Sequence, residues 1–300
     1  MTVYSQIATN KAKTYLVMTI FILIFSGFFY FVGKYFGSPT PYFILGITIS
    51  LLSTFGSYFF SDKIVLLTTG AKPANKKQFF DFYTVTENLA IADGLPMPKL
   101  YVIDDPSPNA FATGRDSHHA VVCATTGLLD RLDRAELEGV IAHELSHVKN
   151  YDILLSSIVA VLVGTLALIA DWIMRSFWWG GIGRKRDNEE EGRSPLFFVL
   201  FIIVLILTPL IATIIQLAVS RRREFLADAN GALLTRYPEG LAKALEKISG
   251  DPHVLATATT STAHLFITNP FKKERVHSFI SNLFSTHPPV EERIKILRSM

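Results

Sequence analysis

The sequence predicts a mainly α-helical, multi-pass membrane protein that also has a small antiparallel β-sheet. Long runs without any charged residue occur at four places in the 300 residues: 14–33, 35–61, 153–170 and 194–220. Each run comes near or exceeds the roughly 20 apolar residues that a helix needs to cross the hydrocarbon layer. The sheet is predicted by short β-like stretches that Pro, Asp and Gly separate: 99–103, 109–113 and 120–124.

The hydrophobic runs divide the chain into four predicted parts. These are an N-terminal tail with two transmembrane helices, the first part of a soluble domain, a pair of further hydrophobic helices and the second part of that domain: 1–61, 62–152, 153–219 and 220–300. The second helix pair either crosses the bilayer or forms a hairpin that penetrates it in part. Within the soluble domain, residues 75–92 have helical spacing and precede the helix stop Gly94-Leu95-Pro96.

The composition argues against a nucleic-acid partner. The formal net charge of +3 is small, and no cluster of basic and aromatic residues provides a binding surface. Basic residues that border the hydrophobic runs, such as Arg221–Arg223, instead indicate contact with the headgroups of a lipid bilayer. The single cysteine, Cys123, rules out an intramolecular disulfide and is compatible with a reducing compartment.

The clearest chemical signal is the segment 143–147, His-Glu-Leu-Ser-His. Residues 133–136, Asp-Arg-Ala-Glu, have the form of a capping box and predict that a helix begins there. On that helix His143 and His147 lie one turn apart on one face, where two imidazoles can hold a single zinc ion. Glu144 can then take the proton of a water molecule that the metal activates, which predicts metal-dependent hydrolysis.

A catalytic zinc site needs three protein ligands and one open position. The best candidate for the third ligand is Glu224, four residues before Asp228, because both carboxylates would face the same way on a helix. One of them can bind the metal while the other orients a histidine ring. Two hydrophobic runs separate His147 from Glu224, and two crossings return the chain to the same membrane side. These residues predict a zincin-like catalytic domain.

Several blocks of the sequence resemble the HtpX family of membrane metalloproteases, which is related to the CAAX prenyl endoproteases. The blocks are 143–147 with Asn150 and Asp152, 220–224 with Ala227-Asp228, 109–114, 263–267, and 286–289 with Glu292-Arg293. The resemblance covers nearly the full length and keeps the order of the segments. Tyr151 departs from it, because the relatives usually carry a small residue between this Asn and Asp.

The resemblance implies a role for each residue of the metal site. It makes His143, His147 and Glu224 the ligands of one Zn²⁺ per chain. It makes Glu144 the general base, and Asp228 a residue that supports a ligand from outside the metal's own contacts.

The resemblance also implies which residues contact the substrate. His287 would stabilise the tetrahedral oxyanion, because a positioned donor near developing negative charge lowers the barrier. The segment formed by Asn109, Ala110, Phe111 and Ala112 would be an edge strand onto which an extended substrate backbone pairs.

The function that follows is a zinc endoprotease of the bacterial cytoplasmic (inner) membrane. More Lys and Arg residues lie on the N-terminal side of the hydrophobic runs than on the opposite side, which favours a catalytic domain that faces the cytoplasm. The quality-control and stress-response role of the family implies that the substrates are misfolded membrane proteins.

Three alternatives remain open at this point. A processing protease of the prenyl-endoprotease type would have more membrane spans than the four runs seen here. An intramembrane protease would place the zinc motif inside an apolar run, whereas Arg134, Glu136 and Lys149 surround it in this chain. A non-catalytic zinc-binding membrane scaffold would not need Glu144 between its ligands.

Overall fold

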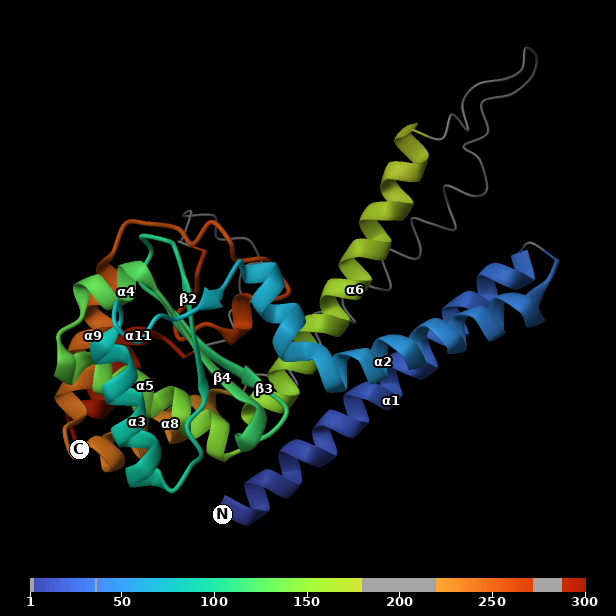
Figure 1. Cartoon of the computed structure of the whole chain (residues 1–300). Helices are drawn as coiled ribbons and strands as arrows, with labels where there is room; N and C mark the ends of the chain where they lie inside the picture. Colours follow the sequence, from blue (N-terminus) through green and yellow to red (C-terminus); the bar gives the residue numbers. More distant parts are fainter. Residues whose placement is uncertain (1–2, 36, 180–219, 272–287) are drawn as a thin grey trace.

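The structure is a computed structural model that describes residues 3–35, 37–179, 220–271 and 288–300. The fourth predicted hydrophobic run lies outside these residues apart from Ser220, and so does His287. Strands and shorter helices form one body, from which long helices project to one side (Figure 1).

Helices α1 (Val3–Tyr35) and α2 (Pro39–Thr69) form an antiparallel pair that contains the first two hydrophobic runs (Figure 1). The segments Gln6–Lys34 and Pro39–Thr69, of 29 and 31 residues, are long and apolar enough to cross a membrane. Between the helices, the hydroxyl oxygens of Ser26 and Ser50 lie 3.4 Å apart. Small polar residues are typical of contacts between membrane helices. The two N-terminal hydrophobic runs therefore form helices that are long and apolar enough to be membrane spans.

Helix α6 (Asp152–Trp179) contains the third hydrophobic run, and its first half packs against α1 and α2. Its buried Leu155 and Ile158 share one apolar cluster with Phe21 of α1. Helix α6 follows α5 (Arg134–Lys149) at an angle of 84°. The described residues contain two candidate membrane spans, or three if this bent pair is counted as one span.

The sheet has four strands in the order β1 (Lys72–Pro73), β2 (Lys99–Ile103), β4 (Ala120–Thr125) and β3 (Ala110–Gly114). Strands β2 and β4 are parallel, while the two other neighbouring pairs are antiparallel. The sheet is therefore mixed, and the prediction of an antiparallel sheet is wrong for β2 and β4. Strand β3 follows β2 in sequence but lies at the edge of the sheet. Strand β4 lies between β2 and β3 and runs in the same direction as β2. Alternating hydrophobicity assigns side chains to faces and does not choose the neighbouring strand.

One apolar core joins the sheet to α3, α5, α8, α9 and α11. The bounds of the helices not yet given are α3 (Phe80–Asp93), α4 (Thr126–Arg131), α8 (Arg221–Thr235), α9 (Pro238–Gly250) and α11 (Val290–Leu297), with short 3-10 helices η1 (Ser117–His119) and η2 (Ala263–Leu265). Helix α3 begins later than the predicted residue 75, because the N–H of Lys77 donates to the Asn75 side chain in a turn. It ends at Gly94, whose φ of 69° closes the helix in the left-handed region.

Helix α5 begins where the capping box predicts. The Asp133 carboxylate accepts from the N–H of Glu136 at 2.9 Å, and the Glu136 carboxylate accepts from the N–H of Asp133 at 2.8 Å. Both pairings satisfy N–H groups that have no partner within the helix. The side chains of Val140, Ile141 and Leu145 are fully buried. Helix α5 therefore lies inside the domain, in contact with the sheet, α3, α8 and α9.

Candidate active site

The two histidines of the predicted metal site project from one face of α5. The side chain of His143 is buried and that of His147 is partly buried, with 1% and 15% exposed. Their Nε2 atoms lie 3.2 Å apart. Two nitrogens that bind one tetrahedral zinc ion would be about 3.3 Å apart, given the usual Zn–N distance. The four-residue spacing therefore brings both nitrogens to the separation that a shared ion requires.

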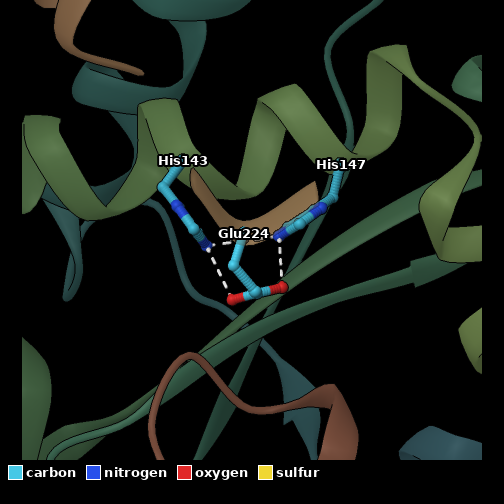
Figure 2. Close-up of side chains that lie close together, drawn as sticks. All are labelled: His143, His147 and Glu224. Carbon is cyan, nitrogen blue, oxygen red and sulfur yellow. Dashed lines mark hydrogen bonds and ion pairs between the residues drawn. The ribbon is translucent and has the colours of Figure 1, made fainter. Parts of the chain in front are cut away.

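Glu224 reaches the two histidines from the first turn of α8. Figure 2 shows both imidazole rings pointing from α5 toward its carboxylate, which lies 3.6 Å from Nε2 of His147 and 3.9 Å from Nε2 of His143. Helix α8 comes this close to α5 because Gly231 has no side chain: a Cβ there would lie 3.2 Å from the backbone nitrogen of His143. The three ligand atoms lie within 4.8 Å of one another.

Besides Glu224, each histidine has a carboxylate partner of its own, which accepts a hydrogen bond from the Nδ1 side of the ring. The Nδ1–H of His143 donates to Asp228 at 2.8 Å, and the Nδ1–H of His147 donates to Asp152 at 3.0 Å. These bonds fix the tautomer in which both Nε2 atoms are free to bind a metal. Two imidazoles and a carboxylate, with one position left open, are the donor set of a catalytic zinc site. The residues present therefore fit a divalent metal of this kind.

Arg293 of α11 holds Asp228 in place. Its Nε and Nη2 donate to the two oxygens of the Asp228 carboxylate at 2.8 and 2.7 Å, and its Nη1 donates to the carbonyl of Ile267 at 3.0 Å. Burial disfavours the Asp228 carboxylate, but the charge and hydrogen bonds of Arg293, with the hydrogen bond from His143, lower the pKa of Asp228 to about 2. Asp228 is therefore an anion that can hold the ring of His143.

Glu144 lies beside the ligands and is only 2% exposed. Burial raises the pKa of Glu144 to about 7, although the charge of His147 and the backbone N–H of Ala112 act in the opposite direction. The charge of Glu224 contributes to the increase. A carboxyl group with a pKa near neutral can accept a proton and then donate it at the same pH.

Comparison with known proteins agrees with this geometry. The sequence model of the family described as "Peptidase family M48" matches residues 76–300. The chain belongs to this family. It is 47% identical to a protein named Protease HtpX homolog from Tropheryma whipplei (strain Twist), over 99% of this chain and 98% of that protein. A protein of the same name from Caldanaerobacter subterraneus subsp. tengcongensis is 44% identical, over 100% of this chain and 98% of the relative.

A solved structure shares the fold of this M48 peptidase. The Ste24p structure from S. mikatae superimposes with a TM-score of 0.50 at 19% sequence identity, and the match covers 98% of this chain and 66% of that chain. The family and the HtpX relatives establish a membrane-associated metallopeptidase, a hydrolase that depends on a divalent metal and acts on peptides. The resemblance to the HtpX family is confirmed.

The predicted substrate strand lies at the edge of the sheet, and other segments already bond to part of that edge. The carbonyl of Ala110 accepts from the N–H of Ile267 at 2.9 Å, and the N–H of Gly114 donates to the Ser157 hydroxyl at 3.3 Å. Ala112 lies between them and lines the pocket that contains the three ligands.

The other members of the predicted substrate segment do not line that pocket. Phe111 is fully buried and packs edge-on against Phe266, with ring centroids 5.1 Å apart. The Asn109 amide is also buried and donates to the carbonyl of Thr268 at 3.2 Å. These two side chains hold the strand in position beside the segment that follows η2.

Sequence reasoning assigned no role to Asp152 and Arg293. Asp152 lies five residues after His147, beyond the end of α5, so that helical spacing does not bring the two together. A charged residue at the start of an apolar run is the signal that could have identified it. Arg293 lies 65 residues from Asp228, and no pattern in the sequence indicates their contact.

Proposed function

We propose that this M48 peptidase is a zinc endopeptidase in which His143, His147 and Glu224 bind the metal. The observation that carries the proposal is the convergence of these three side chains on one point, with Glu144 beside them. Zinc in such a site polarises a substrate carbonyl and lowers the pKa of water. The chain's own residues then determine where the proton goes and how the substrate lies.

Glu144 is the proposed general base. Its carboxylate takes the proton of the attacking water, and the carboxylic acid that forms donates it to the leaving amine nitrogen. Asp228 and Asp152 keep the two rings oriented throughout, since each accepts a hydrogen bond from Nδ1. His287 is proposed to donate to the oxyanion that develops on the carbonyl.

The proposed substrate is an extended, unfolded segment of a membrane protein. Ala112 lies on the β3 edge and lines the pocket of the proposed ligands, and main-chain pairing at a sheet edge recognises extended backbone of many sequences. This breadth suits misfolded proteins as substrates. Pairing at this edge would place a peptide bond of the substrate beside the metal ligands, because Ala112 shares their pocket.

We also propose that the catalytic domain faces the cytoplasm from the bacterial inner membrane. Helix α1 begins beside the domain and α2 returns to it (Figure 1), so that the N-terminus and the active site share one membrane side. The distribution of Lys and Arg around the hydrophobic runs favours the cytoplasm for that side.

The test compares Glu144→Gln with the wild-type protein in proteoliposomes. Glutamine keeps the size of the side chain but cannot accept the proton, so we expect a full zinc equivalent and cleavage of an unfolded substrate slowed by at least about 100-fold. His143→Ala should lose both zinc and cleavage. Undiminished cleavage by Glu144→Gln would refute the proposed mechanism.

A further inference from the structure

The N-terminal part of α1, in its third turn, contains a buried amide that points at the active site. Asn10 is 3% exposed. Its Nδ2 donates to the carbonyl of Asn150 at 2.9 Å and to the carboxylate of Asp152 at 2.7 Å. Asn10 is separated from these partners by 140 and 142 residues. A side chain on a candidate membrane helix thus contacts the carboxylate that backs a metal ligand.

These two acceptors lie on opposite sides of the bend between α5 and α6. Asn150 lies just past the end of α5, and carbonyl groups at the end of a helix have no hydrogen-bond donor within that helix. Asp152 is the first residue of α6. His147 lies in the last turn of α5, and its hydrogen bond to Asp152 crosses the bend. One amide group therefore holds both sides of the junction on which the orientation of His147 depends.

The same amide also contacts the helix that carries the third ligand. Arg223, next to Glu224 on α8, donates through Nη1 to Asp152 at 3.0 Å and to Oδ1 of Asn10 at 3.4 Å. Both N–H groups and the oxygen of the Asn10 amide thus have partners. A buried amide whose N–H groups and oxygen all have partners favours one arrangement of the groups around it, although Nε and Nη2 of Arg223 have no hydrogen-bond partner among the described residues.

We infer that Asn10 is a positioning residue for the active site: it holds Asp152, and through Asp152 the ring of His147. Helix α1 is on this account part of the catalytic centre as well as a membrane anchor. The inference rests on the proposed metal site. A shift of α1 relative to α6 would release Asp152 and lower the affinity for the metal before any residue that touches the metal had changed.

This inference is tested by the zinc affinity of the full-length protein in lipid nanodiscs. The affinity is measured by competition with a chromophoric chelator. Asn10→Leu keeps the branching of the side chain and removes its amide, and Asn10→Ala guards against a steric effect of leucine. We expect both variants to weaken zinc binding about tenfold. This is the low end of the loss in metal affinity that follows when a residue that hydrogen-bonds to a metal ligand is removed. Thr14→Val is the matched control: Thr14 lies one turn further along α1 and is fully buried, and within the described part of the chain its hydroxyl donates only to the Asn10 carbonyl.

A double-mutant cycle separates positioning from general stabilisation. If Asn10 acts through Asp152, then Asn10→Leu should change zinc affinity by no more than about twofold in an Asp152→Ala background. An equal loss in both backgrounds, or no loss in either, overturns the inference. If the wild-type protein itself binds no zinc, or if His147→Ala keeps full affinity, the proposed metal site fails instead, so the two failures are distinguishable.

Discussion

Arg293 and Asp228 form a doubly hydrogen-bonded ion pair in the interior of the protein, and each is 1% exposed. Asp228 in turn accepts from Nδ1 of His143. The C-terminal helix α11 is thereby connected to the metal site through one carboxylate. His147 has an equivalent support in Asp152, which Arg223 and Asn10 hold. Each histidine is backed by a carboxylate, and each carboxylate by an arginine.

Arg293→Ala should therefore destabilise the fold and weaken metal binding together. Removing one partner of a buried ion pair leaves an uncompensated charge and costs about 3–5 kcal/mol. The midpoint of thermal unfolding and the zinc content of the purified protein measure the two effects. Arg298→Ala is the control, because Arg298 pairs at the surface with Glu239 and Glu246, and it should change neither. Similar behaviour of the two variants would contradict the structural role of Arg293.

Glu224→Ala should remove the proposed third metal ligand without disturbing α8. The first turn of α8 keeps its backbone hydrogen bonds, since the N–H groups of Arg223 and Glu224 both donate to the carbonyl of Ser220. We expect zinc content to fall well below one equivalent while the helical circular dichroism stays the same. Glu246→Ala, an exposed carboxylate on α9, serves as the control. A full zinc equivalent in Glu224→Ala would move the third ligand elsewhere.

Tyr151 adopts a φ of 60°, in the left-handed region, at the bend between α5 and α6. This backbone costs a residue other than glycine about 1–2 kcal/mol, while the contact of Lys11 with the Tyr151 ring, 4.4 Å from its centroid, returns about 0.5–1 kcal/mol. Tyr151→Gly should therefore change the free energy of unfolding by less than about 1 kcal/mol. Tyr151→Val loses the ring and keeps the strain, so its midpoint of thermal unfolding should be clearly lower than that of Tyr151→Gly. Equal midpoints would argue against strain at this position.

Much of the fold follows from local signals in the sequence. The capping box at Asp133 and Glu136 predicts where α5 begins, because both pairings are made within four residues. Helical spacing then places His143 and His147 on one face. The positions of β2 and β4 follow from composition and from the Pro, Asp and Gly residues beside them.

The contacts between distant segments could not be predicted in this way. Local alternation does not reveal that β4 lies between β2 and β3. The bonds of Asn10 to Asp152 and of Arg293 to Asp228 join segments that only the completed fold brings together. A buried polar side chain looks in the sequence like an exposed one, so these supports of the site become visible only with its geometry.

Asp251 should make stability depend on pH in the acid range. Burial would raise its pKa, but hydrogen bonds from His253 and the charge of Arg131, 2.8 Å away, hold the pKa of Asp251 below its ordinary value. The stabilisation is therefore fully present above the unfolded-state pKa of about 3.9 and is lost as the pH falls through the lower folded-state value. Asp251→Asn should unfold at a lower temperature than wild type at pH 7, with a difference that shrinks below about pH 4. Asp130→Asn, at an exposed position of α4, is the control and should unfold at the wild-type temperature at pH 7.

Ala112→Pro tests whether the edge of β3 receives the substrate. Proline is tolerated on edge strands but removes the N–H of Ala112, which the structure directs at Glu144. We expect a full zinc equivalent, because no ligand changes, together with a raised KM and a lowered kcat for an unfolded substrate. Ala112→Gly keeps the N–H and should retain most of the activity, which controls for loss of the methyl group. An unchanged KM in Ala112→Pro would mean that the substrate does not pair with this N–H, and a lowered kcat alone would reflect the lost contact with Glu144.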